Sequence, residues 1–194
     1  MKICCLGDSL TEGDYGVFGK SGIANVHSEN YPYYLSCLSG AEVFNFGRCG
    51  HRASDYLMYY QSGQVNISTA DMVIIMLGTN GGHNAKHDTP DNEAYEKLVA
   101  LCRKDAPYAQ IILCTPPHAT EDPVMSNCGY APQVTQAVLF IRALAKREHL
   151  KLIDVAACQD FNSQTEQLYQ SNDGLHFNRL GYKLLAAYIY EHLF

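Results

Sequence analysis

KICCLGDSL, residues 2–10, is the stretch around which this chain is organised. Its apolar part, Ile3–Leu6, has the length and composition of a buried β-strand, and the strand is expected to end at Gly7. The hydroxyl of Ser9 follows two residues later. A buried strand that leads into a glycine-flanked turn is how many α/β proteins raise one side chain above the edge of a sheet, where ligands bind. Taken alone, Ser9 has an alternative role as a helix N-cap, a position that favours serine.

Four more apolar runs of strand length follow along the chain, each bounded by Gly, Pro, Asp or Asn. They are Glu42–Phe46, Met72–Leu77, Gln110–Cys114 and Leu152–Val155. The segments between them have helical spacing; they are Tyr31–Leu38, Ser54–Tyr60, Asn92–Lys104, Ala131–Glu148 and Asn178–Leu193. Strands that alternate with helices and are apolar on both faces indicate a parallel sheet covered on both sides. The sequence therefore predicts an α/β fold, a three-layer α/β/α sandwich with about five parallel strands, in a single domain over residues 1–194.

The composition excludes several classes of protein. The formal net charge is -6, which argues against a nucleic-acid-binding surface. No apolar stretch approaches the roughly 18–20 residues of a membrane span, and the first apolar run is too short for a secretory signal. The 8 cysteines lie mostly in apolar runs and form no Cys-x-x-Cys pair. This pattern predicts reduced, mostly buried thiols in a cytoplasmic protein, and no thiolate zinc site.

Polar residues follow the predicted strands at the edge where the carboxyl ends of parallel strands meet. A serine hydroxyl needs a base within about 3 Å to remove its proton. For Ser9 the best candidate base is His176, because Asp173 lies three residues earlier and can orient the imidazole through its second nitrogen. The alternatives are a simple Asp-Gly turn at Asp173 and a solvent-exposed histidine at His176.

Attack of Ser9 on an ester carbonyl would place negative charge on oxygen, and preorganised N–H donors would stabilise that charge. The candidates are the backbone N–H groups of Ser9 and Gly50 and the side-chain amide of Asn80. Gly50 has the alternative role of permitting positive φ, and Asn80 that of a turn former. Serine, histidine and aspartate with such donors are what nucleophilic acyl transfer requires.

These residues stand in four blocks that resemble the GDSL, or SGNH, hydrolase family of esterases and acylhydrolases. The blocks cover essentially the whole chain in the family's order; they are Gly7–Leu10, Asn45–Gly50, Gly78–Asn80 and Asp173–His176. The resemblance implies that Ser9 is the nucleophile, His176 the base and Asp173 the orienting acid. It also implies an oxyanion hole made by Ser9, Gly50 and Asn80, a flavodoxin-like sandwich, and no metal or organic cofactor.

One position departs from the family. Aspartate commonly follows the third-block asparagine, whereas this chain has Gly81 and then Gly82. The loop is then held by His83, or it leaves room for a bulky substrate.

Several polar groups near the expected site remain without a single assignment. His51, His83 and His118 also follow predicted strands, where a rival base or a metal cluster is the alternative to substrate contacts or surface positions. Cys49 is either a reactive thiol or a side chain packed beneath its loop. The composition of the segment 120–132 indicates an exposed excursion of the chain, which forms either a wall of the pocket or a contact with a partner.

The functional expectation is a serine ester hydrolase that acts through an acyl-enzyme on a small-molecule ester. The acyl group is expected to be short and acetyl-like, on a sugar or small polar alcohol, because no long hydrophobic lid is visible and the 14 tyrosines can stack on sugars. The alternatives are a lysophospholipase or thioesterase for longer acyl chains, a non-catalytic ligand-binding module on the same fold, and an acyltransferase. The oligomeric state stays open.

Overall fold

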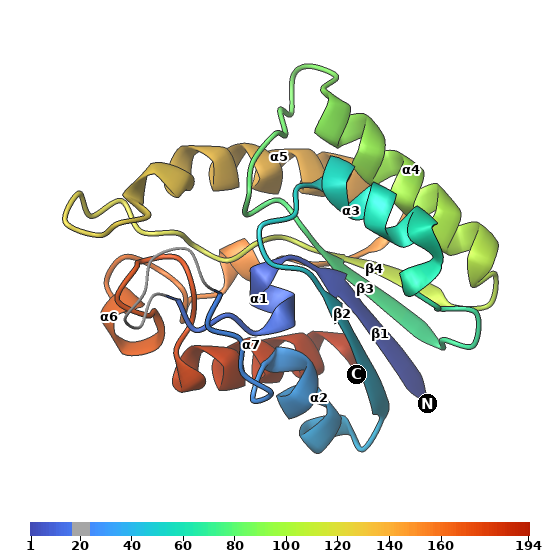
Figure 1. Cartoon of the computed structure of the whole chain (residues 1–194), viewed down its shortest axis with the longest axis horizontal. Coiled ribbons are helices and arrows are strands. Elements are labelled where there is room, and N and C mark those ends of the chain that lie inside the picture. Colours follow the sequence, from blue (N-terminus) through green and yellow to red (C-terminus); the bar gives the residue numbers. More distant parts are fainter. Residues whose placement is uncertain (17–23) are drawn as a thin grey trace.

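A five-stranded parallel sheet forms the centre of the molecule in the computed structural model, which describes residues 1–16 and 24–194 (Figure 1). The spatial order of the strands is β2-β1-β3-β4-β5, and every neighbouring pair is parallel. The strands are β1 (Lys2–Gly7), β2 (Glu42–Gly47), β3 (Met72–Met76), β4 (Gln110–Cys114) and β5 (Lys151–Ile153). The predicted α/β class and the five predicted strands are confirmed, with ends that differ by at most two residues.

Helices cover both faces of the sheet and complete the three layers (Figure 1). One face carries α2 (Tyr31–Ser39) and α7 (Arg179–Leu193); the other carries α3 (Ala53–Tyr59), α4 (Pro90–Asp105) and α5 (Ala131–Arg147). All five correspond to predicted helices. Two helices of four residues each, α1 (Ser9–Glu12) and α6 (Glu166–Tyr169), were not predicted, because one turn is too short to show a helical period.

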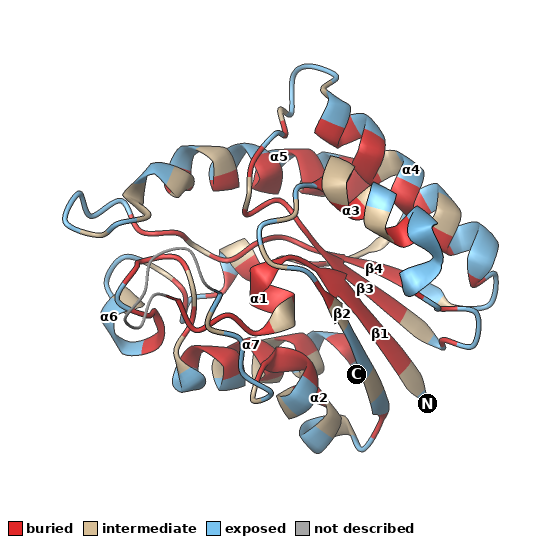
Figure 2. Cartoon of the chain, viewed as in Figure 1, coloured by how far each residue is buried: buried red, intermediate tan, exposed pale blue. Residues whose placement is uncertain are grey.

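The alternation of side chains along each strand divides the core into two parts. In β1, Ile3 and Cys5 pack toward α2 and α7, whereas Cys4 and Leu6 pack toward α3, α4 and α5. All four are buried, as are most residues of β3 and β4 (Figure 2). Burial on both faces explains why these strands read as continuous apolar runs.

The outermost strand β2 departs from that pattern. Phe44 is 38% exposed, and Asn45 next to it is exposed as well. The expectation of strands buried on both faces is therefore wrong for β2, because it is an edge strand and, among the described residues, pairs with β1 alone.

Local signals set the ends of the principal helices. Asn30 caps α2 by accepting a hydrogen bond from the N–H of Tyr33, and Gly40 ends the helix with φ of +66°. Thr89 caps α4 and Asn178 caps α7 in the same way, each through its side-chain oxygen. Within the part of the chain that the structure describes, no helix has both the length and the apolar character needed to cross a membrane.

Candidate active site

Ser9 lies at the carboxyl end of β1, where the strand turns directly into α1. The preceding Asp8 caps the helix, since its Oδ1 accepts a hydrogen bond from the N–H of Leu10 at 3.1 Å. A side chain on Gly7 would overlap with Thr11, so only glycine fits in this tight turn. Burial raises the pKa of the Asp8 carboxyl to about 6, although its bond to Leu10 opposes the change. The turn therefore holds Ser9 at the carboxyl edge of the sheet, directly after β1.

The structure brings Ser9, His176 and Asp173 together, as expected from the sequence. Nε2 of His176 lies 2.9 Å from Oγ of Ser9, although the two residues are 167 positions apart. Nδ1 of the same ring lies 2.6 Å from Oδ2 of Asp173. The other oxygen of Asp173, Oδ1, accepts hydrogen bonds from the N–H groups of Leu175 and His176 and from the hydroxyl of Ser171. These bonds orient the carboxylate toward the imidazole.

Burial and charge act in opposite directions on the imidazole. Burial by itself lowers the pKa of His176, but the hydrogen bond and charge of Asp173 outweigh it, and the carboxylates of Asp14 and Asp8 add to the rise. The net result is a pKa above the ordinary histidine value of 6.5. For Asp173, burial acts to raise the pKa, yet the bond to His176 holds it well below its usual range. The carboxylate is therefore ionised and pairs with the imidazole.

The predicted oxyanion donors border the same cavity, which has a volume of about 240 Å³ and contains Ser9, Gly50 and Asn80. Gly50 has φ of +75°, a conformation that favours glycine, in the loop after β2. The side-chain Nδ2 of Asn80 donates one hydrogen bond to the backbone carbonyl of His51 at 3.0 Å, and the backbone carbonyl of Asn80 accepts one from Nε of Arg52. A primary amide has two N–H groups, so Asn80 keeps a second donor for a ligand.

The comparisons with known proteins show the family of the chain. A family model described as the GDSL-like Lipase/Acylhydrolase family matches residues 5–184. The chain belongs to this family. It is a carboxylic ester hydrolase of the GDSL type. It is similar to the isoamyl acetate-hydrolyzing esterase of Schizosaccharomyces pombe, with 27% identity over 188 residues, or 95% of this chain and 71% of the relative.

Solved structures with the same fold cover nearly the whole chain. The M. smegmatis aryl esterase superposes with a TM-score of 0.78 at 20% identity and covers 99% of this chain and 97% of its own. A carbohydrate acetylesterase from Sinorhizobium meliloti gives a TM-score of 0.74 at 20% identity, with the same coverage of 99% and 97%. At these identities the likeness shows the sandwich fold alone.

This acylhydrolase lacks the aspartate that commonly follows Asn80 in the family, and a different residue occupies that space. A side chain at Gly81 would overlap with the amide of Gln133 from α5. Gln133 donates a hydrogen bond from Nε2 to the carbonyl of Thr79 at 3.3 Å. The loop that carries Asn80 is thus held from α5.

A further contact holds the same loop from the start of α4. Nδ1 of His83 lies 3.0 Å from Oδ1 of Asn92, so His83 holds this loop. This is one of the two alternatives that the sequence left open for the loop with Gly81 in place of aspartate. Asp91 accepts hydrogen bonds from the N–H and hydroxyl of Ser54, at 3.0 and 2.8 Å, which ties α4 to α3. His83 is buried and stacked on Phe140, so the expectation of a surface or substrate-contacting position is wrong for this histidine.

One wall of the cavity comes from the segment 120–132, for which the sequence left a pocket wall and a partner contact open. Asn127 and Tyr130 line the cavity with Ser9. The N–H of Asn127 also donates to the carbonyl of Asp173 at 3.1 Å, so the segment packs directly on the turn that precedes α7. Only part of the segment is an exposed excursion, since Thr120 is fully buried.

Two residues that line the cavity differ from the expectations based on the sequence. Asp14 was not among the candidates named from the sequence, but it lines the same cavity as Ser9. Its position only five residues after Ser9 was a signal that could have identified it. Cys49 lines it too, instead of packing beneath its loop. Burial, a hydrogen bond with Glu12 and nearby carboxylates raise the pKa of the Cys49 thiol, so it is not an activated thiolate.

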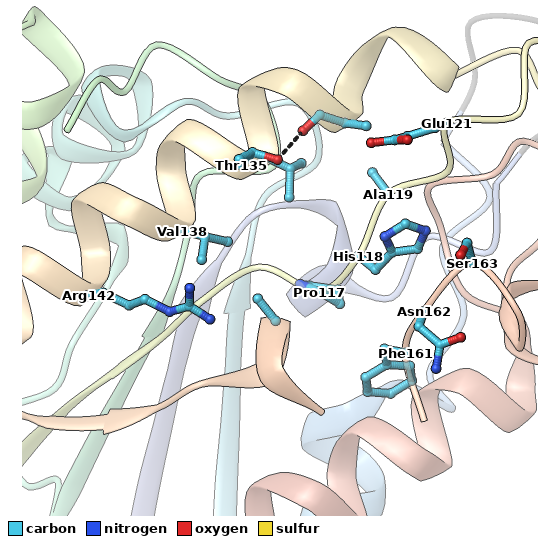
Figure 3. A pocket seen from close by; sticks show the side chains of 13 residues that line it. Pro117, His118, Ala119, Glu121, Thr135, Val138, Arg142, Phe161, Asn162 and Ser163 are labelled. Carbon is cyan, nitrogen blue, oxygen red and sulfur yellow. Dashed lines mark hydrogen bonds between the residues drawn. The ribbon is translucent and has the colours of Figure 1, made fainter. Parts of the chain in front are cut away.

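A second cavity of about 430 Å³ is also lined by part of the segment 120–132, and Figure 3 shows His118, Glu121 and Arg142 around it. His118 lines this second cavity and not the cavity that contains Ser9, and its Nε2 lies 3.0 Å from Oε2 of Glu166. His51 packs against Tyr59. Among the described residues, no three His, Cys, Asp or Glu side chains are grouped so that they could hold a metal ion.

Proposed function

We propose that this protein is a serine esterase that acts through an acyl-enzyme on short-acyl, acetyl-like esters of a sugar or small polar alcohol. The observation that carries the proposal is the continuous hydrogen-bonded array from Ser9 to His176 to Asp173, with distances of 2.9 and 2.6 Å. It borders a cavity that also contains the donors of Gly50 and Asn80. A nucleophile, a base, an orienting acid and N–H donors in one cavity are the set that acyl transfer uses.

The geometry supports a two-step reaction. Oγ of Ser9 bonds to the carbonyl carbon while its proton moves to Nε2 of His176, and the oxyanion accepts hydrogen bonds from Ser9, Gly50 and Asn80. The bond from carbon to the alcohol oxygen then breaks, and the imidazolium returns its proton to that oxygen. A water molecule attacks the acyl-enzyme, gives its proton to Nε2, and the acid leaves as Ser9 regains its proton. Each oxyanion donor contributes about 3–4 kcal/mol in such reactions.

The size and lining of the cavity favour a short acyl group. Its volume is about 240 Å³ and several of its lining residues are polar, among them Asp14, Asn80 and Asn127. Two relatives carry names that refer to acetate esters, the isoamyl acetate-hydrolyzing esterase and the carbohydrate acetylesterase. An acyl chain of eight or more carbons needs apolar contact along its length. A lysophospholipase or thioesterase activity is the alternative if such contact is made.

The first test measures kcat/KM for p-nitrophenyl acetate, butyrate and octanoate. We expect the acetate to be hydrolysed fastest and the octanoate at least about 10-fold more slowly, because the additional methylene groups of the longer acyl chain lack apolar contacts in the cavity. Equal rates on acetate and octanoate would contradict the short-acyl proposal. A fluorophosphonate probe should label Ser9 covalently, since only an activated serine reacts. A folded protein without labelling would instead support the non-catalytic binding module.

The pH dependence follows from the surroundings of His176. As the proposed base, His176 must be neutral, and its raised pKa means that it becomes protonated already above pH 6.5 as the pH falls. We therefore expect kcat/KM to fall on the acid side with a midpoint above 6.5. The groups that face the ring are Asp173, Asp14 and Asp8, all of which favour the protonated form. A midpoint below 6.5, measured with an ester that does not titrate, would contradict this assignment.

Two finer points belong to the same proposal. Transfer of the acyl group to a second alcohol differs from hydrolysis only in the final acceptor, so product analysis with and without added alcohol separates the two. We also place the enzyme in the cytoplasm, because several thiols, including those of Cys4, Cys5 and Cys114, are packed in the core as free cysteines.

A further inference from the structure

The cavity around Ser9 contains a second carboxylate that the proposed reaction does not use. Asp14 is only 7% exposed, and it lines the cavity together with Ser9 and His176. Its Oδ2 lies 3.8 Å from Nε2 of His176, on the nitrogen opposite to the one that Asp173 contacts. A carboxylate held at this depth needs hydrogen-bond donors to offset its desolvation.

The position of Asp14 is set by contacts on its other side. Its Oδ1 accepts hydrogen bonds from the backbone N–H groups of Gly16 at 2.9 Å and Asn25 at 3.0 Å. Its carbonyl accepts one from the hydroxyl of Tyr182 in α7 at 2.6 Å. With Oδ1 occupied, Oδ2 is the oxygen that faces His176. Among the described residues its neighbouring donor is the thiol of Cys49 at 3.9 Å, and a thiol is a weak donor.

The chemistry of the reaction relates Oδ2 to the alcohol half of the ester. Nε2 of His176 must return a proton to the departing alcohol oxygen, so that oxygen comes within about 3 Å of Nε2. Because Oδ2 of Asp14 is 3.8 Å from the same nitrogen, it lies next to the departing alcohol. A carboxylate can only accept hydrogen bonds. An alcohol with a donor near the ester oxygen satisfies it, whereas a purely apolar alcohol leaves it unpaired.

We propose that Asp14 is a specificity-determining residue that accepts a hydrogen bond from the alcohol half of the ester, from a hydroxyl or a protonated amine close to the ester oxygen. This inference rests on the proposed function, because it takes the alcohol to leave from the side of His176. It narrows the substrate class to esters of polyols, sugars or amino alcohols, and it disfavours esters of simple alkanols.

The test compares three acetates of similar size: propyl acetate, 2-hydroxyethyl acetate and 2-(dimethylamino)ethyl acetate, the last protonated at neutral pH. The variant is Asp14→Asn. Because the N–H groups of Gly16 and Asn25 require an acceptor, the amide oxygen of the variant must face them. Its NH₂ group then faces the cavity. The substitution thus keeps the shape and the backbone contacts while it replaces an acceptor with a donor. Asp122→Asn, an exposed turn aspartate outside the cavity, is the matched control.

The readout is the ratio of kcat/KM for each donor-bearing acetate to kcat/KM for propyl acetate. Any effect of Asp14 on the imidazole is common to all three esters and cancels in this ratio. We expect the wild type to prefer at least one donor-bearing ester by about 10-fold or more, and Asp14→Asn to lose that preference. Loss in the hydroxyl arm assigns a hydroxyl ligand, and loss in the amine arm assigns an ammonium ligand.

Negative results would contradict either the role of Asp14 or the esterase proposal, and the two cases can be distinguished. Ratios near one in the wild type, or ratios that Asp14→Asn leaves unchanged, contradict the role of Asp14 while the esterase proposal stands. The wild-type ratios need no variant, so this part of the test does not depend on the folding of Asp14→Asn. Failure of the proposed function has a separate signature, since hydrolysis of all three acetates would then be absent or would persist in Ser9→Ala.

Discussion

Ser9→Ala is expected to lower kcat for p-nitrophenyl acetate by about 10⁴- to 10⁶-fold, the loss seen when a serine nucleophile is removed from a working hydrogen-bonded set. The reason is that the variant keeps the cavity and its N–H donors but has no oxygen to form the acyl-enzyme. Ser9 is 3% exposed and its Oγ contacts His176, so alanine removes one polar atom without adding volume. We therefore expect the thermal unfolding midpoint to change by only a few degrees.

Ser163→Ala is the matched control for this experiment. Ser163 is exposed and lines the second cavity with His118, not the cavity that contains Ser9. We expect it to retain wild-type kcat and fluorophosphonate labelling. Substantial activity of a purified Ser9→Ala protein, well above the background of a Ser9→Ala/His176→Ala double variant, would mean that the nucleophile is another residue.

Asp173→Asn is expected to reduce kcat by about 10³- to 10⁴-fold, comparable to the loss when the orienting acid of a serine protease is neutralised. Oδ1 of Asp173 accepts three hydrogen bonds, from the N–H groups of Leu175 and His176 and the hydroxyl of Ser171. In the variant the amide oxygen must occupy that position, so its NH₂ group faces Nδ1 of His176. Nδ1 then accepts a hydrogen bond, and the ring proton moves to Nε2, where it blocks removal of the Ser9 proton.

The measurement for Asp173→Asn is the rate of hydrolysis together with the rate of fluorophosphonate labelling, both of which depend on activation of Ser9. Asp160→Asn, at an exposed position, controls for loss of charge. Retention of more than about a tenth of wild-type kcat by a folded Asp173→Asn protein would be too much for an orienting acid. That result would favour the alternative role of Asp173, in which the Asp-Gly pair only forms a turn.

The alternation of apolar runs with helical segments was enough to predict the five strands, because buried parallel strands carry their signal locally, in four to six consecutive residues. The same holds for the turns that present the site. Gly7 and Ser9 at the end of β1, Gly50 at positive φ, and the spacing of Asp173 and His176 all depend on neighbours along the chain. The candidate catalytic residues Ser9, Asp173 and His176 could therefore be proposed before the distances between them were known.

The order of residues along the chain was thus sufficient to predict which residues form the strands and which polar side chains follow their carboxyl ends. Three features were visible only after the chain was folded: β2 lies exposed at the edge of the sheet, His83 is buried against Phe140, and the carboxylate of Asp14 points toward His176. Each of these depends on contacts between segments far apart in the chain, such as the hydroxyl of Tyr182 on the carbonyl of Asp14, 168 positions away. Hydrophobic periodicity indicates which face of a helix or strand is buried, but not which other segments pack against that face. The direction of a polar side chain depends on its contacts with those other segments.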